Sequence, residues 1–464
     1  MRDGAGQGQL AQLMMETAFA LRCDAHDNFP AVARVSRRLT GMIEWRRIRG
    51  AFAFLALVMI YSGVLVIARI ARGHRRVRSR KTGDPGSRCR RIIVTGTFYH
   101  SGWFGSHILP LSRAAVDEII VVCDEPQMAV PKVRYCCPPR WAARLLGRAL
   151  SKTMWMVAIG SRYPADIFMG YHIFPGALSA LLAASLHGKA SCYQSTGGPI
   201  EVLGGGVNTE NRFLSSLPGP SRHLESLALR VAGRFDCIVV RGHRAMRFFA
   251  ERGRNGNVVI IPGSIDPDRF EWQDARDYDL VFVGRLTEIK QPLRFIDVIA
   301  AVRKSIPSVR AAVVGDGPLM AKTQRYAARL GVTECIDFLG ERNDVERIVT
   351  RSRIVVLTSR SEGLSIAMAE SMAAGAVPVV ADVGELSDVV RDGENGFLVK
   401  PQCPREYADR IVSLLDDPDR WLRFARAARK AARGYCGVAS VAARWDRCLR
   451  KTIVSGGAAH SGVN

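Results

Sequence analysis

The chain has 464 residues, 48% of them apolar, and no strong low-complexity block, which excludes a generally disordered protein. Lysine and arginine number 66 against 43 acidic residues, so the net charge of +23 predicts a polyanionic partner: an anionic membrane face, a phosphorylated substrate or nucleic acid. The prediction of a nucleic-acid partner would rest on charge alone, because neither zinc-finger spacing nor an RNP-like motif occurs. Eleven scattered cysteines without a C-x-x-C pair are expected to be free thiols in a reducing compartment rather than metal ligands.

The segment Gly50–Ala68 carries no charge and would be about 28 Å long as a helix, close to the thickness of a bilayer core. Arginines flank both ends and are more numerous after the segment, so we expect a membrane helix at residues 46–72 and the domains that follow it in the cytoplasm. A secretory signal peptide and a helix lying in the membrane interface are the alternatives. Residues 1–45 are expected to be a tail, with Met42 as another candidate start, and residues 73–90 a basic linker.

From Arg91 onward the sequence alternates between short apolar runs and helix-like segments, a pattern that predicts parallel strands covered by helices. After the first strand, at 91–95, we expect a loop that contains Gly96, Gly102 and Gly105. Further strands of this half are expected at 118–123, 166–170 and 237–241, and a helix at 175–186.

The second half repeats this rhythm, so the fold class is expected to be α/β with two Rossmann-like, doubly wound domains. Ligands of such sheets bind at the carboxyl ends of the strands, which here would face a cleft between the domains. The turn-rich segment Ile260–Asp279 is the expected hinge. We therefore assign an N-terminal domain at 91–262, a second domain at 263–425, and a C-terminal crossover helix and tail at 426–464.

Two glutamates late in the second domain stand seven residues apart, Glu362 in a Ser/Gly loop and Glu370 in an Ala/Met-rich run expected to be helical. The loop places three backbone amides at a helix N-terminus, which is a ready site for an anion. A carboxylate on each side of this site could hold sugar hydroxyls while the amides hold phosphate. Two solvated glutamates on an ordinary helix are the alternative. The amides belong to Gly363, Leu364 and Ser365.

Two cations and several glycines follow the first strands of the second domain. Gly284 permits close backbone approach, Arg285 can bind two phosphate oxygens at once, and Lys290 adds a point charge. Such a pair can neutralise a diphosphate leaving group, although two surface cations of a basic protein would look the same in isolation. Gly315 and Gly317 mark a tight turn after the next strand, which either lines the same cleft or serves only as a turn.

In this order and spacing, the motifs of residues 262–425 resemble the retaining glycosyltransferases of family 4, also called glycosyl transferases group 1. The shared elements are G-R-L-x-x-x-K from Gly284, V-G-x-G-P, E-x7-E from Glu362 and D-G-x-N-G-x-L-V. The hinge sequence is similar to P-N-G-V-D, with Gly263 and Ser264 in place of Asn and Gly. Glu385 stands where the family usually has the second glycine of a pair.

The resemblance implies a GT-B fold, a nucleotide-sugar donor, retention at the anomeric carbon and no required metal. It implies that Arg285 and Lys290 hold the diphosphate, that Glu370 binds the ribose and that Glu362 binds the donor sugar. The segment ending at Arg342 matches the part of the family whose backbone contacts the base. No convincing D-x-D metal motif is present, so no metal site is expected.

The N-terminal half matches the family weakly, as expected for the side that binds the acceptor. The family often carries a histidine after a later strand of this domain, where this sequence has none. His172 follows an earlier strand and either lines the cleft or serves the structure. Glu201 and Glu210 flank a glycine-rich segment that is a flexible acceptor loop or a surface connector.

These features predict a membrane-anchored, cytoplasm-facing, metal-independent glycosyltransferase that moves a sugar from a nucleotide-sugar donor to a glycan or lipid-linked acceptor in envelope polysaccharide or glycolipid synthesis. The expected partners are the donor, the acceptor and the membrane, without nucleic acid and without a cofactor. A GT-B sugar-nucleotide epimerase and an inactive basic membrane scaffold are the alternatives. The donor sugar, the base, the acceptor and the oligomeric state are open.

Overall fold

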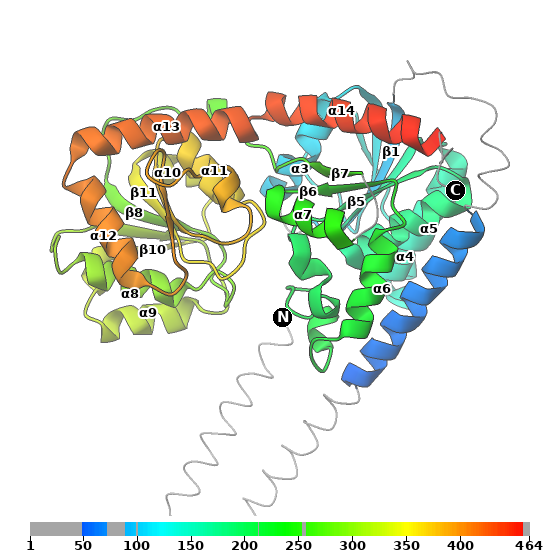
Figure 1. Cartoon of the computed structure of the whole chain (residues 1–464), viewed down its shortest axis with the longest axis horizontal. Helices are drawn as coiled ribbons and strands as arrows, with labels where there is room; N and C mark the ends of the chain where they lie inside the picture. Colours follow the sequence, from blue (N-terminus) through cyan, green and yellow to red (C-terminus); the bar gives the residue numbers. More distant parts are fainter. Residues whose placement is uncertain (1–48, 72–88, 99–100, 212, 253–256, 458–464) are drawn as a thin grey trace, which may run out of the picture.

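The computed structural model describes residues 49–71, 89–98, 101–211, 213–252 and 257–457. The tail expected at 1–45 and nearly all of the linker expected at 73–90 lie outside these residues. The described residues form two parallel sheets, each covered by helices, side by side in Figure 1. The α/β architecture of two Rossmann-like domains expected from the sequence is therefore confirmed.

The N-terminal sheet has the strand order β3-β2-β1-β4-β5-β6-β7. The five central strands of this sheet are short, mostly apolar and largely buried on both faces, which is typical of parallel sheets covered by helices on each side. The strands are β1 (Cys89–Thr95), β2 (Val116–Val122), β3 (Val133–Tyr135), β4 (Ile167–Tyr171), β5 (Ala190–Gln194), β6 (Cys237–Val240) and β7 (Val258–Ile260). The helices are α3 (Ser101–Arg113), α4 (Arg140–Arg162), α5 (Leu178–His187), α6 (Arg222–Ala232) and α7 (His243–Arg252).

The expected glycine loop after the first strand is wrong in extent, because α3 begins at Ser101 and includes Gly102 and Gly105. Phe104 and Ile108 recur at helical spacing and are fully buried, so packing outweighs the low helix propensity of glycine. Gly105 also has a steric role, since a Cβ there would lie 2.9 Å from the sulfur of Met128.

The C-terminal sheet has the order β10-β9-β8-β11-β12-β13. The strands are β8 (Tyr278–Val283), β9 (Ala311–Val314), β10 (Ile336–Gly340), β11 (Ser352–Leu357), β12 (Val377–Ala381) and β13 (Phe397–Val399). The helices are α8 (Pro292–Val302), α9 (Met320–Arg329), α10 (Val345–Thr350), α11 (Ile366–Ala373) and α12 (Pro404–Leu415). Most strand residues are fully buried, and each buried Val, Ile or Leu contributes about 1.5–3 kcal/mol to the hydrophobic stabilisation of this domain.

The last two helices join the domains. Helix α13 (Pro418–Cys436) packs on the C-terminal domain, and α14 (Val438–Gly457) crosses onto the N-terminal one, as Figure 1 shows in orange and red. Trp445 and Leu449 of α14 are buried in the N-terminal core. At the crossing, Ile265 pairs with the backbone on both sides of Gly437, through Ile265 N to Cys436 O (2.9 Å) and Val438 N to Ile265 O (3.0 Å). The two chain segments that connect the domains are therefore hydrogen-bonded to each other.

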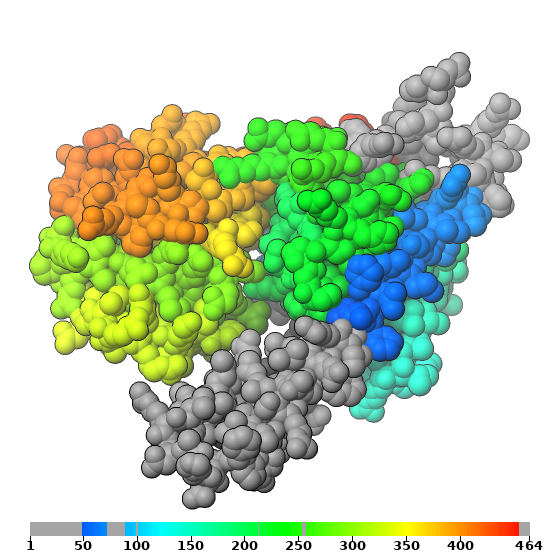
Figure 2. Space-filling view, turned by 60° about the horizontal axis from the view of Figure 1, so that its bottom comes forward, coloured from blue at the N-terminus to red at the C-terminus, as the bar shows by residue number. Residues whose placement is uncertain are grey.

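The apolar segment near the N-terminus forms one helix, Arg49–Ala71, long and apolar enough to cross a membrane. It lies on the N-terminal domain beside α5 and α6, in blue in Figures 1 and 2. One stripe of the helix is buried there: Ala53, Leu57, Tyr61, Val64 and Ala68. The helix is therefore both apolar enough for a membrane and packed along the N-terminal domain.

Candidate functional site

The loops that follow β8, β9 and β10 pack together through glycine backbone. Gly284 N donates to Val314 O (2.9 Å), and Gly315 N donates to Gly340 O (2.7 Å). A Cβ at Gly315 would lie 2.1 Å from Gly284 O, so no other residue fits there without moving the backbone. Gly317 is equally confined, with a Cβ 2.6 Å from Leu286 O. These glycines hold the loops at the carboxyl ends of the strands, where ligands of such sheets bind.

Lys290 and Glu362, from the loops after β8 and β11, form the central ion pair of this edge. Lys290 Nζ lies 2.7 Å from Glu362 Oε1, and Ser359 Oγ donates to the same oxygen at 2.6 Å. The Glu362 side chain is only 7% exposed, so the pair fixes the carboxylate in one orientation. Within the described residues no hydrogen bond reaches Oε2 of Glu362, which leaves that oxygen for a ligand.

The N-terminus of α11 lies next to this pair. Ser365 is the N-cap residue and accepts a hydrogen bond from Met368 N (3.3 Å). Among the described residues, the amides of Gly363 and Leu364 donate no backbone hydrogen bond. Unused amides and the positive end of the helix dipole favour an anion at this position.

Arg285 extends from the loop after β8 toward the other domain. Its guanidinium is 3.6 Å from Glu210 Oε2, and both side chains are largely exposed. Exposed ion pairs of this kind are worth only about 0–1 kcal/mol, so a charged ligand can displace Glu210 at little cost. Arg285 is thus available to an anion that enters between the domains.

Glu370 lies on α11, one turn beyond its first residues. Burial raises the pKa of Glu370 to about 7, against the opposing charge of Arg269. A bound group that donates hydrogen bonds to this carboxylate would restore its ionised form. Arg342, in contrast, is exposed and bonded to its near neighbour Asp344 at 2.8 Å.

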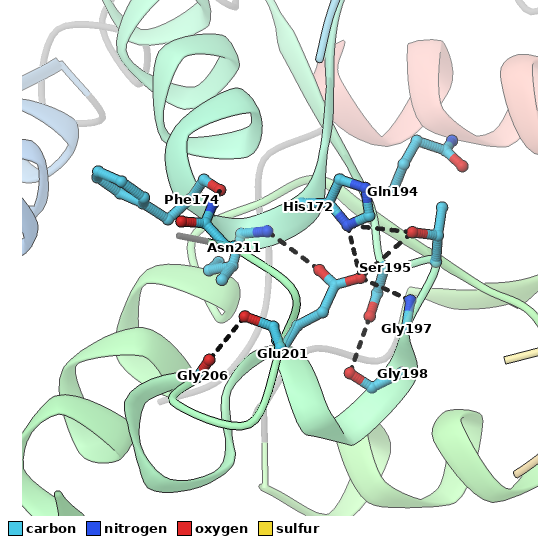
Figure 3. Close-up of polar contacts among 12 residues, drawn as sticks. His172, Phe174, Gln194, Ser195, Gly197, Gly198, Glu201, Gly206 and Asn211 are labelled. Atoms are coloured by element: carbon cyan, nitrogen blue, oxygen red, sulfur yellow. Dashed lines mark hydrogen bonds and ion pairs between the residues drawn. The ribbon is translucent and has the colours of Figure 1, made fainter. Parts of the chain in front are cut away.

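The N-terminal domain contributes a network around one buried carboxylate, Glu201, which Figure 3 shows. Its oxygens accept from Gly197 N (2.6 Å), Tyr193 Oη (2.8 Å) and Ile173 N (3.1 Å), and Oε1 lies 3.2 Å from His172 Nδ1. Burial alone would raise the pKa of Glu201, but the charge of His172 and these hydrogen bonds outweigh it and lower the pKa. The segment after β5 that could have been a flexible loop is therefore anchored at Glu201.

His172 stands at the end of β4 in a left-handed conformation (φ 60°), which is uncommon for residues other than glycine. Its ring is stacked with Trp103, with centroids 6.1 Å apart and 17° between the planes. Nδ1 is held by Glu201 and by Thr196 Oγ1 (3.1 Å), whereas Nε2 is buried without a hydrogen-bond partner among the described residues. The fold thus fixes this imidazole in one orientation.

The two halves of the site touch each other at Gly363, because a Cβ at this position would lie 2.3 Å from Thr196 O. Beneath the contact is Arg241, a fully buried guanidinium at the end of β6. It donates to Ile261 O (2.6 Å) and Gln194 Oε1 (3.3 Å). Burial lowers the pKa of Arg241 to about 10, so this side chain remains a cation at neutral pH between the two sheets.

A second interdomain contact binds the C-terminal domain to the start of α7. Glu385 is buried, and its carboxylate accepts from Arg244 N (3.0 Å) and Ala245 N (2.8 Å). Asp388 accepts from His243 N at 2.9 Å and from Tyr435 Oη at 3.1 Å. Two acidic side chains of one domain therefore cap a helix of the other, in the arrangement that its unpaired amides favour. We call Glu385 and Asp388 the interdomain cap.

Within the described residues, no group of three or more His, Cys, Asp and Glu side chains is arranged to hold a metal ion. The ten cysteines of this part of the chain are free, and seven are buried.

Sequence reasoning missed three parts of the site: the buried Arg241, the anchoring role of Glu201 and the interdomain cap. The signal for Glu385 was present, since it was the point where the sequence departs from the glycine pair of the family that it resembles. Arg241 carried no signal, because a single arginine after an apolar strand is common in a chain with 66 basic residues.

Comparison with known proteins relates the C-terminal domain to one family. The family model described as glycosyl transferases group 1 matches residues 264–431. The D-inositol 3-phosphate glycosyltransferase of Salinispora tropica is 30% identical over 189 residues, 38% of this chain and 38% of the relative. The chain spans less than half the length of this relative and of others at similar identity. The 2-deoxystreptamine glucosyltransferase of Streptomyces kanamyceticus is 26% identical over 68% of this chain and 87% of its own length.

Among solved structures, the Anabaena protein HepE in complex with UDP matches with a TM-score of 0.63 at 17% identity, over 78% of this chain and 99% of HepE. At this identity the match establishes the fold, which is the two-domain GT-B arrangement.

Proposed function

Because the domain at residues 264–431 belongs to the glycosyl transferases group 1 family, we propose that this chain transfers a sugar from a nucleotide-sugar donor to a glycan or lipid-linked acceptor, with retention at the anomeric carbon and without a metal. The single observation that carries the proposal is the Lys290–Glu362 pair beside the N-terminus of α11 (2.7 Å). A cation, a fixed carboxylate and unused amides at one point suit a ligand that combines phosphate with sugar hydroxyls.

We propose that the donor is a uridine diphosphate sugar. HepE, which shares the fold over most of both chains, was solved with UDP. In this chain the turn at Gly315 and Gly317 and the segment ending at Arg342 would lie beside the nucleoside, and Glu370 would accept hydrogen bonds from the ribose. The raised pKa of Glu370 supports this role, because hydroxyl donors would stabilise the ionised carboxylate that burial disfavours.

The diphosphate would meet Arg285, Lys290 and the amides of Gly363, Leu364 and Ser365. Arg285 is exposed and weakly paired, so it can turn from Glu210 to the phosphate. Negative charge grows on the leaving diphosphate as the sugar departs, and fixed cations and amide dipoles stabilise that charge best when they need no rearrangement. These groups should therefore act on turnover at least as much as on affinity.

Glu362 would hold the sugar. Lys290 and Ser359 occupy its Oε1, so Oε2 is the oxygen available to a sugar hydroxyl. In the reaction, the bond between the anomeric carbon and the diphosphate oxygen breaks, and a bond to the acceptor oxygen forms on the same face. The acceptor proton passes to the departing phosphate oxygen, so atoms and charge balance without a further reactant.

The acceptor would enter along the N-terminal domain, past His172, which Glu201 and Trp103 hold in place. An acceptor of the cell envelope fits two features of the chain: the apolar helix Arg49–Ala71 and the excess of basic residues. We propose that the enzyme acts at the cytoplasmic face of a membrane, on an envelope glycan or glycolipid.

The test is calorimetry of the purified full chain against a panel of uridine, guanosine and adenosine diphosphate sugars, followed by assay of nucleoside diphosphate release. We expect one donor to bind, and release to depend on added acceptor. An epimerase would convert the donor without an acceptor, and an inactive scaffold would release nothing. If no nucleotide sugar binds, the proposal is wrong.

A further inference from the structure

The helix Arg49–Ala71 has two different long faces. One stripe is buried on the N-terminal domain, as described above, and the opposite stripe is exposed although it is equally apolar. Phe52 and Met59 are 69% and 74% exposed. A soluble protein rarely leaves such a continuous apolar stripe in water, so this face calls for a partner. Its members are Phe52, Leu55, Met59, Val66 and Ile70.

Helix α4 exposes a second apolar strip, with basic residues between its members. Trp141 and Leu145 are 66% and 76% exposed, one helical turn apart. Gly147 breaks the helix at φ 78°, and a Cβ there would touch nothing within 4 Å, so this glycine serves the bend rather than packing. Leu150 and Met154 continue the strip beyond the bend.

The two strips belong to one surface of the N-terminal domain. Helix α5 lies between them: Leu178 and Leu181 pack in the cluster that contains the N-terminal helix, while Ala180 and Ala183 pack in the cluster that contains α4. Figure 2 shows the turquoise atoms of the α4 region directly beside the blue helix. Leu186 of α5 is also exposed. We call the exposed apolar residues of these three helices the apolar face.

The charge on this face has one sign. Neither the N-terminal helix nor α4 contains Asp or Glu. Exposed arginines stand at the ends of the N-terminal helix and among the apolar residues of α4. Apolar side chains interleaved with arginine match the boundary between headgroups and acyl chains in an anionic leaflet, where one part is buried and the other stays among phosphates. The arginines are Arg49, Arg69, Arg140, Arg144 and Arg148.

We infer that the apolar face lies flat in the interface of an anionic phospholipid leaflet, with the helix Arg49–Ala71 parallel to the membrane and α4 inserted beside it. The inference extends the membrane part of the proposed function: it names the surface that meets the lipid and the orientation of the helix. It does not depend on which donor the enzyme uses.

The packing of the N-terminal helix favours this orientation over a transmembrane one. Gly50 at its start lies against Pro218, and Ala68 near its end lies in the same core as α5 and α6. Phe54 contacts the ring of His223 on α6, with centroids 6.3 Å apart. A helix docked along this length could cross the bilayer only by drawing charged residues such as Arg222 into hydrocarbon, which is strongly unfavourable.

Sidedness of the helix ends tests the orientation. Single cysteines would replace Arg49, Arg69 and, as a reference in the C-terminal domain, the exposed Lys322 in the full chain. They would be labelled with a membrane-impermeant maleimide in right-side-out and inside-out vesicles of the expression host, with the unsubstituted chain as background. We expect R49C, R69C and K322C to react from the same side. Reaction of R49C from the opposite side would establish a spanning helix and overturn the inference.

Lipid binding tests the part played by α4. Purified full-length protein, diluted from detergent, would be floated with vesicles of phosphatidylcholine alone or with 30% phosphatidylglycerol. We expect W141S/L145S to weaken partition at least about tenfold, because two exposed apolar side chains lose their burial in lipid. We expect R144Q/R148Q to weaken it only on anionic vesicles, and less at high salt. The matched control, R325Q/L330S on α9 and at its C-cap, should bind like the parent.

Both α4 variants change only exposed side chains, so donor affinity by calorimetry should equal that of the parent. This readout separates the inference from the proposed function: lost donor binding in the parent defeats the function and leaves the vesicle result unaffected. Unchanged partition of W141S/L145S would overturn the role of α4. A detergent-free dimer that fails to bind vesicles would assign the apolar face to a second copy of the chain instead.

Discussion

The two domains build their shares of the cleft in different ways. The C-terminal domain uses turns that are local in sequence, where glycine backbones pack too closely for a Cβ and present amides and two cations. The N-terminal domain uses side chains from distant segments, such as Glu201, His172 and Arg241, joined by hydrogen bonds across several strands. The site residues of the C-terminal domain therefore form recognisable sequence motifs, whereas those of the N-terminal domain form almost none.

This difference fits the tasks proposed for the two sides. The diphosphate is the same chemical group in every nucleoside diphosphate sugar, so backbone amides and fixed cations in one geometry can hold it. An acceptor differs from one enzyme to the next, and a side-chain network can change without disturbing the sheet. The interdomain cap joins the two constructions, because acidic residues of the motif-rich domain hold a helix of the other.

The largest expected effect tests the donor side. Lys290→Ala should lower kcat about 10²–10³-fold, because a cation at the leaving diphosphate is removed and the buried Glu362 loses its partner. Donor affinity, measured by calorimetry, should fall less than kcat. Lys304→Ala, an exposed lysine of the same domain, is the control and should behave like the parent. Equal kinetics for both variants would remove Lys290 from the site.

Glu370 should show the next largest effect, through pH. The pKa in the folded chain is about 7 and its ordinary value is 4.5, so the folded state keeps a proton that the unfolded state loses. The stability of the ligand-free protein therefore falls as pH rises from about 4.5 to about 7 and is constant above, a cost of about 3 kcal/mol. Glu370→Gln should remove this dependence in denaturant unfolding, raise stability at pH 8 and weaken donor binding.

The control for that experiment is Glu394→Gln, an exposed glutamate of the same domain that should leave the pH dependence unchanged. If Glu370→Gln unfolds with the parent's pH dependence, Glu370 is ionised in the folded chain and its proposed approach to the ribose loses support.

A smaller effect should follow from breaking the interdomain cap. Glu385→Gly restores the residue that the family usually has, but it removes the carboxylate that accepts from Arg244 N and Ala245 N. A helix cap is worth about 0.5–2 kcal/mol, so kcat/KM should fall about 2- to 30-fold as the domains lose a contact that favours closure. Glu385→Gln keeps an acceptor oxygen and should be milder. Solution scattering that finds the same compactness in all three proteins would contradict a role in closure.

The removal of metal ions should have the smallest effect, which is no change in turnover. Turnover should persist in excess EDTA, because the proposed phosphate ligands are Arg285, Lys290 and amides. Loss of activity on chelation, with recovery on adding magnesium or manganese, would show that the donor side needs a charge the chain does not supply.

Much of the fold could be predicted because it follows from local patterns. The run that became β11, the loop with Glu362 and the helix with Glu370 all lie where apolar periodicity and glycine placed them. The start of α3 could not be predicted. By local propensity Gly102 and Gly105 favour a loop, and only the burial of Phe104 and its neighbours by tertiary contacts favours the helix. Local propensity is a weak guide wherever packing competes with it.

The acceptor side of the site escaped prediction for a related reason. The environment of Glu201 is made by Gly197, Tyr193 and His172, which hydrogen-bond to it only after β4 and β5 pair. The roles of the donor-side residues are still predictions. The fold does bring Lys290, Glu362 and the start of α11 together at one edge of the C-terminal sheet.

The crossing of α14 has a consequence for biosynthesis. The N-terminal domain buries Trp445, Cys448 and Leu449, which are synthesised after the entire C-terminal domain. The earlier part of this domain therefore emerges without the helix that covers α3 and β1, while the C-terminal domain has all its own strands once α13 is made. The domain that is synthesised first is therefore the second to have its core completed. A stop codon before Val438 would spare every residue proposed to touch the donor, yet leave the earlier-made domain without part of its core.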